Sequence, residues 1–204
     1  MDPEIARDVA YIPPVVGNLF VSAGVSLVDR MIDTIPAVQR HQADRITRRI
    51  LERLTTTEDE FLNRLRTDPA VFRLVADTLH AAAWADNEAK LEALSVVASS
   101  GLNDSALLDE SRYIVGVLSE LDVIHVRILA ALDQVETTPK SRFKVADLIE
   151  TSEGISDALT QDLLRLALVK APGMTFTGVH HGVAGLTSFG EQILAVLRSG
   201  EWRR

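Results

Sequence analysis

The residues with the clearest capacity for chemistry are four closely spaced arginines, Arg45, Arg48, Arg49 and Arg53. Guanidinium groups neutralise phosphates and form paired hydrogen bonds with their oxygens, so this arginine stripe is a candidate site for a polyanion or for lipid head groups. A solvated helix face with ion pairs four residues apart explains the same pattern. We favour that second interpretation, because runs of charge on a helix are commonly ordinary surface.

Histidines are the other candidates for metal binding or for a response to pH. His180 and His181 are adjacent, but no third ligand lies near them in the sequence and zinc requires three or four. His125 lies in an apolar stretch and is expected to be a hydrogen-bonded core residue. We therefore predict an exposed loop at His180 and His181, and no metal site.

A polar face on one predicted helix could mark a second contact surface. His80 shares this face with Arg73, Asp77 and Trp84, away from the main apolar side of the helix. A single Asp-x-x-His pair falls short of a di-metal carboxylate site, which needs further carboxylates from other helices.

A segment near the C-terminus has the outline of a helix-turn-helix motif. Predicted helices at Val145–Glu150 and at about Ser156–Val169 are separated by a turn at Glu153 and Gly154. Between 145 and 169 there are five acidic residues and one basic residue, a net charge of −4. Contact with DNA phosphates demands positive charge, so only Gln161 and Arg165 remain as candidates for contacting DNA. We favour a structural or protein-contact role for this segment.

The chain contains none of the local motifs that identify common catalytic sites. G-x-S-x-G, a phosphate-binding glycine loop, G-x-G-x-x-G and H-E-x-x-H are all absent. Cysteine is also absent, which excludes a thiolate nucleophile, a thiolate metal site and a disulfide framework. A site assembled from distant residues leaves no local motif. We expect a protein that is not an enzyme and uses no cofactor.

Composition indicates a packed, soluble protein. Of the 204 residues, 47% are hydrophobic and 25% are charged, which is typical of globular domains and unlike disordered chains. The net charge of −8 repels nucleic acid and anionic lipid unless positive charge is gathered locally. The absence of cysteine and of a recognisable signal peptide favours the cytoplasm.

One apolar segment near the N-terminus needs separate consideration. Tyr11–Val28 contains 18 uncharged residues, which reaches the lower limit for crossing a bilayer. Pro13, Pro14 and several Gly and Ser residues dilute it, so we interpret the helical part, from Val15 to about Asp33, as a buried element of a soluble protein. Membrane action through Val15–Val28 stays as a disfavoured alternative.

Apolar periodicity predicts a helical bundle over the first 120 residues. Helices are expected at Gln42–Leu54, after Thr57, at Ala70–Ala85, from a cap at Asp86 to a stop at Gly101, and after Asn103 or Asp104. The Ala70–Ala85 helix has an apolar arc that consists of Val71, Phe72, Leu74, Val75, Leu79 and Ala82. A further helix is expected at about Asp122–Leu132.

Two short β runs are expected near the C-terminus, one at Met174–Thr177 and one ending at Leu186 and Thr187. They are separated by Gly178–Gly185. A last helix, capped by Ser188, should extend through Leu197.

The region from about Leu121 to Leu197 resembles the winged-helix domains of MarR-type and PadR-type regulators. The resemblance rests on three helices, a two-stranded wing and the sequence LTSFGEQILAVL. In that family a Leu-Thr pair ends the second wing strand and a glycine begins the closing helix, and Leu186, Thr187 and Gly190 occupy those places. The resemblance implies a winged-helix fold and transfers no site residue.

The whole chain also resembles the Abi-alpha family, bacterial proteins linked by name to abortive phage infection. The features that carry this resemblance are an apolar N-terminal segment, DRITRRILERL, AAAWADNEAKLEALSVVASSGLNDSALLDES and the closing LTSFGE. None of them is a catalytic motif. The resemblance implies a defence-associated role.

Together these observations predict a mainly α protein with a helical bundle body at 1–120 and a winged-helix-like module with a short β wing at 121–204. We expect a non-enzymatic interaction protein that binds a protein partner or forms a homo-oligomer. The alternatives are a DNA-binding winged-helix regulator, acting through Gln161 and Arg165, and a membrane-acting effector.

Overall fold

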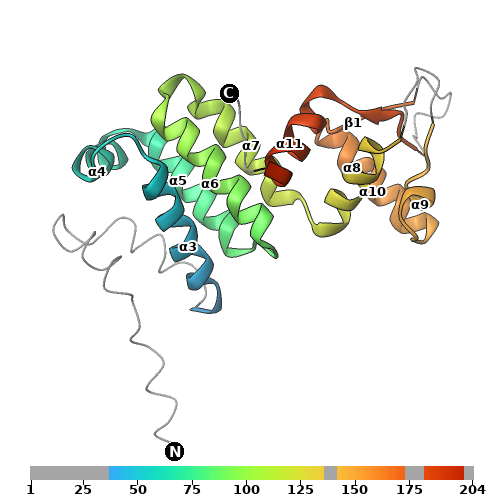
Figure 1. Cartoon of the computed structure of the whole chain (residues 1–204), viewed down its shortest axis with the longest axis horizontal. Coiled ribbons are helices and arrows are strands. Elements are labelled where there is room, and N and C mark those ends of the chain that lie inside the picture. The colour runs from blue at the N-terminus through green and yellow to red at the C-terminus, as the bar shows by residue number, and fades with distance from the viewer. Residues whose placement is uncertain (1–36, 136–141, 173–181, 200–204) are drawn as a thin grey trace, which may run out of the picture.

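The structure is a computed structural model that describes residues 37–135, 142–172 and 182–199 of the chain. The predicted N-terminal segment, the β run at Met174–Thr177 and the pair His180 and His181 lie outside the described residues. Two units lie side by side along the longest axis of the molecule (Figure 1). We call them the helical body, from α3 to α7, and the C-terminal module, from α8 to α11.

The helical body consists of α3 (Ala37–Arg53), α4 (Glu58–Thr67), α5 (Pro69–Ala83), α6 (Glu88–Asn103), the short 3-10 helix η1 (Ser105–Leu107) and α7 (Leu108–Glu120). Helices α3, α5, α6 and α7 pack against one another. Their apolar faces bury a continuous core, whose fully buried members include Ile46, Leu74, Leu79, Leu91, Leu94, Leu102, Ile114 and Leu118. The predicted apolar arc of the Ala70–Ala85 segment faces this core, with Phe72 only partly buried at its edge.

Side-chain caps explain where the helices of the body begin. Thr57 accepts a hydrogen bond from the backbone N–H of Glu60, and Asp68 accepts from those of Ala70 and Val71, with Pro69 opening α5. The predicted cap at Asp86 is wrong by one residue, because Asn87 accepts from the N–H of Lys90 at 2.8 Å.

Gly101 was expected to end a helix, but α6 continues through it to Asn103. A Cβ atom at residue 101 would lie 2.7 Å from Ser111 Oγ of α7. The glycine therefore allows α6 and α7 to approach closely, which is a packing role inside the helix.

The C-terminal module consists of α8 (Val123–Asp133), α9 (Val145–Leu148), α10 (Glu153–Arg165), β1 (Val169–Lys170), β2 (Gly185–Leu186) and α11 (Ser188–Ser199). β1 and β2 are antiparallel, with Val169 opposite Leu186 and Lys170 opposite Gly185. The predicted mainly helical fold with a small two-stranded sheet is confirmed.

The predicted end of the second turn-motif helix at Val169 is wrong, because α10 ends at Arg165. Ala167 has a φ of 57°, a left-handed conformation that stops the helix and directs the chain into β1. Strand β1 therefore begins at Val169 itself. The helix also begins earlier than predicted, since Glu153 belongs to α10 and not to a turn.

Helix α11 is fixed by the three residues that carried the winged-helix resemblance. Leu186 pairs with Val169, and Thr187, not the predicted Ser188, is the cap, since its Oγ1 accepts from the N–H of Gly190 at 2.9 Å. A Cβ atom at Gly190 would lie 2.0 Å from the carbonyl oxygen of Leu168. A side chain at this position is therefore incompatible with the observed approach of α11 to the chain before β1.

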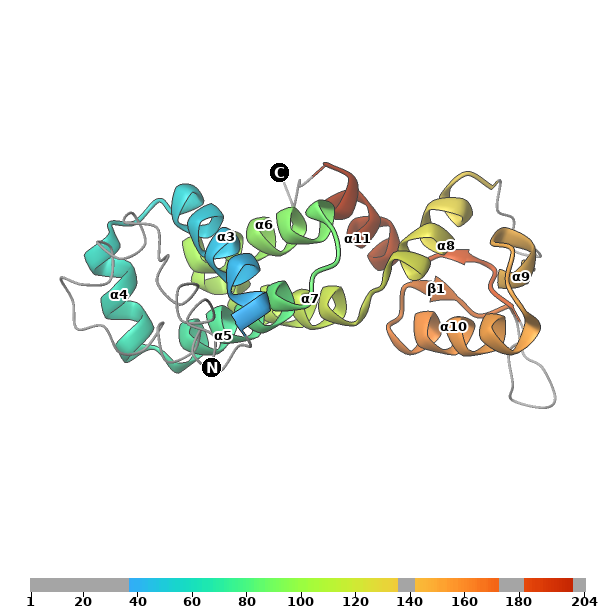
Figure 2. The ribbon, with the colours of Figure 1, turned by 90° about the horizontal axis from the view of Figure 1, so that it is seen from below.

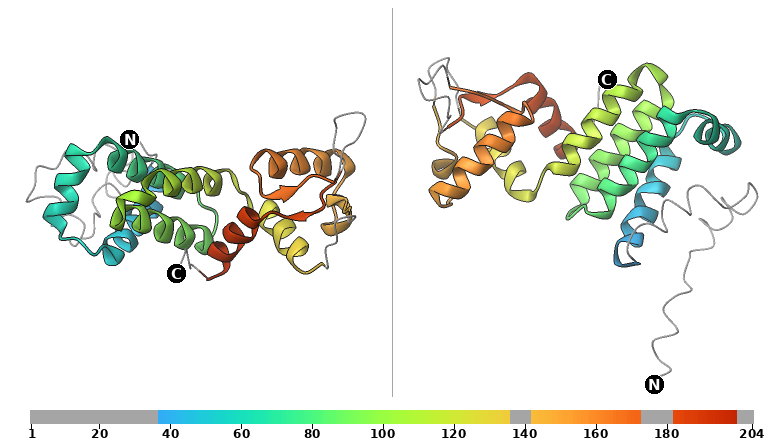
Figure 3. Two further views of the ribbon diagram at one scale, coloured as in Figure 1. Left: turned by 90° about the horizontal axis from the view of Figure 1, so that it is seen from above. Right: turned by 180° about the vertical axis from the view of Figure 1, so that it is seen from behind.

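Helix α11 returns to the body. It lies between α6 of the body and α8 of the module and contacts both (Figure 2). The views from above and behind show the same placement (Figure 3). Among the described helices, none is both long enough and apolar enough to cross a membrane.

Candidate functional site

Three residues of the arginine stripe face α6 and not open solvent. Arg45 Nη2 lies 2.5 Å from Glu88 Oε2, Arg49 contacts Glu88 and Glu92, and Arg53 Nη2 lies 2.5 Å from Glu92 Oε1. Hydrogen bonds from Arg49 and Arg45 lower the pKa of Glu88. The stripe is therefore one side of a ladder of ion pairs between two helices.

Arg48 differs from the other members of the stripe. It is exposed, and within the described ranges it has no ion pair. The predicted ion pairs four residues apart are replaced by pairs between residues about forty positions apart, which local spacing does not reveal. As a candidate polyanion site, the stripe keeps one cation without a carboxylate partner in the described part of the chain.

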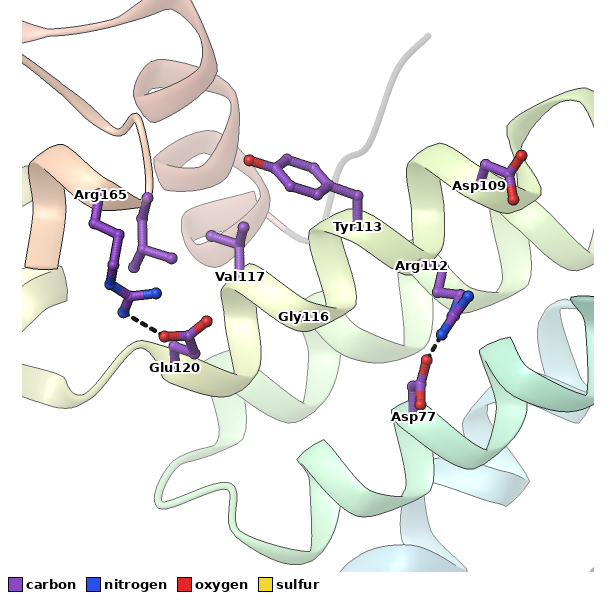
Figure 4. A pocket seen from close by; sticks show the side chains of 9 residues that line it. Asp77, Asp109, Arg112, Tyr113, Gly116, Val117, Glu120 and Arg165 are labelled. Carbon is purple, nitrogen blue, oxygen red and sulfur yellow. Dashed lines mark hydrogen bonds and ion pairs between the residues drawn. The ribbon is translucent and has the colours of Figure 1, made fainter.

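The two candidate DNA-contacting residues lie on the exposed side of α10. Gln161 is exposed, as is Arg165, but the guanidinium of Arg165 is paired with the carboxylate of Glu120 at the end of α7 (Figure 4). A second carboxylate, that of Asp162, lies 3.7 Å from Arg165 Nη2. The turn motif thus offers a basic side chain that is already neutralised by the body.

The exposed side of α10 carries small and apolar residues in its first half and polar residues in its second half. We call this the α10 surface; it consists of Gly154, Ile155, Ala158, Gln161 and Arg165. The Ile155 residue is 52% exposed, which places it among the four most exposed large apolar residues of the described chain. Apolar groups of this kind suit contact with another protein and contribute nothing to phosphate binding.

At its C-terminal end the α10 surface reaches an open cleft between the two units, which we call the junction cleft. It has a volume of about 510 Å³ and is lined mainly by α7, with Asp77 from α5 and Arg165 and Leu166 from the module. Figure 4 shows Tyr113, Val117 and Glu120 along one side of α7, with Arg165 opposite Glu120.

The junction cleft presents both charged and aromatic groups. Arg112 Nε lies 2.7 Å from Asp77 Oδ2. The Arg112–Asp77 and Arg165–Glu120 ion pairs both line the cleft. Between them the ring of Tyr113, a 58% exposed residue, packs on Phe189 of α11 with ring centres 5.7 Å apart. The sequence singled out Asp77 as part of a second contact surface, but the α7 residues carried no signal in their spacing.

A buried histidine lies beside the same junction. His125 Nδ1 accepts a hydrogen bond from the backbone N–H of Asp122 at 3.1 Å, so the ring proton of the neutral form belongs on Nε2. His125 Nε2 is buried, has no hydrogen-bond partner within the described residues and lies 3.9 Å from Asp162 Oδ2. Burial lowers the pKa of His125, and the carboxylates of Asp122 and Asp162 act against this shift.

Lys90 connects the ends of two helices of the body. Its Nζ donates to the carbonyl oxygen of Leu121 at 2.7 Å and to that of Ser119 at 3.3 Å, which are carbonyls at the C-terminal end of α7. Burial lowers the pKa of Lys90. The contact positions the chain that leads from α7 into the module.

The described residues contain no group of three or more His, Asp or Glu side chains placed to hold a metal ion. The charged groups at the junction form ion pairs between helices: Arg112–Asp77 lies within the body, and Arg165–Glu120 joins the body to the module. Comparison of the chain with protein-family models, curated proteins and solved structures found no match. The two family resemblances therefore stay predictions.

Proposed function

We propose that this protein is a non-enzymatic interaction protein that binds a partner protein along the α10 surface and the junction cleft. The observation that carries the proposal is the ion pair between Arg165 and Glu120, which neutralises the basic residue of the turn motif. At the other end of α10, the apolar side chain of Ile155 is exposed. Exposed apolar and aromatic residues beside a cleft favour protein contact.

The geometry suits an extended partner. The residues from Gly154 to Arg165 recur at helical spacing along one side of α10, so they form a strip about 16 Å long that ends at the cleft. The exposed Tyr113 supplies an apolar contact at the cleft, and large aromatic residues commonly dominate binding energy.

A photo-crosslinking experiment tests this proposal. A photoreactive phenylalanine analogue replaces Ile155 or Tyr113 in the full chain in its native cell, and Arg66, which is exposed on α4, is the matched control position. We expect a protein adduct of defined mass from both surface positions and not from the control. Identification of the adduct by mass spectrometry separates a second copy of this chain from another protein. Adducts equal at all three positions, or none, would contradict the proposal.

DNA binding is the second candidate function, supported by the arrangement of α9 and α10 followed by the β1–β2 pair. In winged-helix proteins the second helix of the turn motif enters the major groove. DNA adducts at Ile155 in the same experiment would favour this regulator over the interaction protein.

The remaining parts of the proposal rest on the sequence. A cytoplasmic location is supported by the absence of cysteine, and a role in phage defence by the resemblance to Abi-alpha proteins alone. Membrane action would depend on Val15–Val28, outside the described residues.

A further inference from the structure

A second hollow is lined by residues of both units. This apolar groove has a volume of about 300 Å³, at the lower end of the roughly 300–1,000 Å³ typical of small-molecule sites. Its walls come from the chain after α7, from α8 and from α11, and they include Leu121, Val126, Leu194 and Leu197. The N-terminal end of α6 closes it with Ala89 and Lys90.

The charged side chains that line this groove are all cations, although Asp133 pairs with one of them, and Asp86 and Asp122 act on another. Three cations line it, Lys90, Arg127 and Arg198, and no Asp or Glu of the described chain is among the lining residues. This is notable in a protein whose net charge is −8. A ligand with an apolar body and an anionic end would therefore match both the walls and the charge of the groove.

The three cations are not equivalent. The Lys90 ammonium is engaged with the carbonyl oxygens at the end of α7, and Arg198 Nη1 lies 2.6 Å from Asp133 Oδ2. Arg127 is exposed at the groove and forms no ion pair with any residue that the structure describes. It is the cation of the groove that remains available for an incoming anion.

We propose that the apolar groove binds a free fatty carboxylate with a single alkyl chain, whose carboxylate pairs with Arg127. The alkyl chain lies between α8 and α11, where it is removed from water. The groove is too small for two chains, which favours a free fatty acid over a bilayer lipid. Because its walls include α6 of the body as well as α8 and α11 of the module, the ligand contacts both units.

The test is calorimetric titration of the full chain with decanoate below its micelle concentration, compared with decyltrimethylammonium. The second probe has the same alkyl chain and the opposite charge, so equal binding of the two would overturn the proposal, as would no binding of decanoate. Flotation with phosphatidylglycerol vesicles is the parallel measurement. Binding to vesicles without binding to decanoate would assign the groove to a membrane surface and would also overturn the proposal.

Two variants assign the binding to the groove. Ala89→Trp fills it from an exposed position and should abolish decanoate binding, whereas Ala106→Trp, at an exposed alanine of η1, should leave it unchanged. Arg127→Glu should weaken binding about five- to tenfold, since an exposed attraction is replaced by repulsion. Its matched control is Arg73→Glu on α5, which does not line the groove.

The variants also detect other occupants. Thermal melting establishes that each variant is folded, and Arg127→Glu tests the proposal if Ala89→Trp does not fold. Retained binding in a folded Ala89→Trp variant would overturn the proposal. A concentration-dependent dimer that is lost in Ala89→Trp would assign the groove to a second copy of this chain and overturn it in the same way.

Discussion

The guanidinium of Arg165, at the end of α10, is paired with the carboxylate of Glu120, at the end of α7. This contact links the turn motif of the module to the last helix of the body. The hydrogen bond and charge of Glu120, with a smaller contribution from Asp162, raise the pKa of Arg165. Arg165, the residue of the motif best suited to contact DNA, therefore forms an intramolecular ion pair.

We predict that the protein does not bind duplex DNA with useful affinity. Non-specific DNA binding depends on released counterions, and the turn motif has a net charge of −4 with its arginine already paired. The measurement is an anisotropy titration with a mixed-sequence duplex and a fragment from the protein's own locus at about 150 mM salt, where specific complexes commonly have Kd values of about 10⁻⁸–10⁻¹¹ M. Nanomolar binding that is lost in Arg165→Glu would make the regulator the better proposal.

Leu79→Asp is expected to unfold the helical body. Leu79 is 2% exposed in the core between α5 and its neighbours, so an unpaired carboxylate there should cost about 3–5 kcal/mol of unfolding free energy. His80→Asp introduces the same charge at the next, exposed position and should melt close to the parent protein. Similar melting temperatures for Leu79→Asp and the parent would show that Leu79 does not face the core.

The arginine stripe is expected to give little retention on heparin. Glu88 and Glu92 neutralise three of its members, so a polyanion would have to displace these carboxylates. The simultaneous change of Arg45, Arg48 and Arg49 to Glu should remove any residual retention, and it should also lower the melting temperature because it places carboxylates opposite Glu88. Arg48→Glu alone separates the loss of heparin retention from the loss of stability. It changes the charge of the stripe and leaves the ion pairs with Glu88 and Glu92 in place. Strong, salt-sensitive retention of the parent would support a polyanion site.

Acidification is expected to destabilise the protein partly through His125. Burial lowers the pKa of this histidine in the folded protein, whereas in the unfolded chain it titrates near its usual value of about 6.5. Between these two pKa values the unfolded chain binds a proton that the folded protein does not. The stabilising contribution of neutral His125 is therefore complete above about pH 6.5 and decreases as the pH falls toward the folded pKa.

Urea unfolding at a series of pH values above the range where carboxylates titrate measures this effect. The free energy of unfolding of the parent should fall more steeply with decreasing pH than that of His125→Gln. His80→Gln, a change at an exposed histidine, should follow the parent. Equal slopes for the parent and His125→Gln would rule out a contribution from the buried imidazole.

Gly190→Ala is expected to destabilise the module severely. The added Cβ would lie 2.0 Å from the carbonyl oxygen of Leu168, which belongs to the backbone and cannot move without displacing the β1–β2 pair. Gly116→Ala is the matched control, because a Cβ at this exposed helical glycine meets no atom within 4 Å and should stabilise α7 by about 0.5–1 kcal/mol. A Gly190→Ala protein that unfolds at the same denaturant concentration as the parent would contradict the observed packing of α11.

The elements of the body could be predicted because their signals are local. The apolar arc of α5, the capping residues Thr57 and Asp68 and the proline at position 69 all act within one or two helical turns. Where two neighbouring residues could each cap, as at Asp86 and Asn87, pattern alone did not distinguish them. The end of α10 was also mispredicted, since nothing in the local pattern indicated the left-handed Ala167.

The candidate site could be predicted only in fragments. The spacing of the arginines predicted that they share one side of a helix. Their carboxylate partners on α6 lie about forty positions later in the sequence, so local spacing could not indicate them. Glu120 and Arg165 are 45 residues apart in the chain, and neither belongs to a motif that would pair them. The junction cleft and the apolar groove arise from the return of α11 to the body, and no local pattern indicates that return.

The return of α11 has a mechanical consequence. The module is attached to the body by the covalent chain at Leu121 and by α11, which packs on α6 and places Phe189 against Tyr113 of α7. These contacts restrict relative movement of the two units more than a covalent linker alone would. The exposed Arg165–Glu120 pair bridges the units as well. A partner that displaced Glu120 from Arg165 would therefore remove one link between the units, while the packing of α11 would still hold the module against the body.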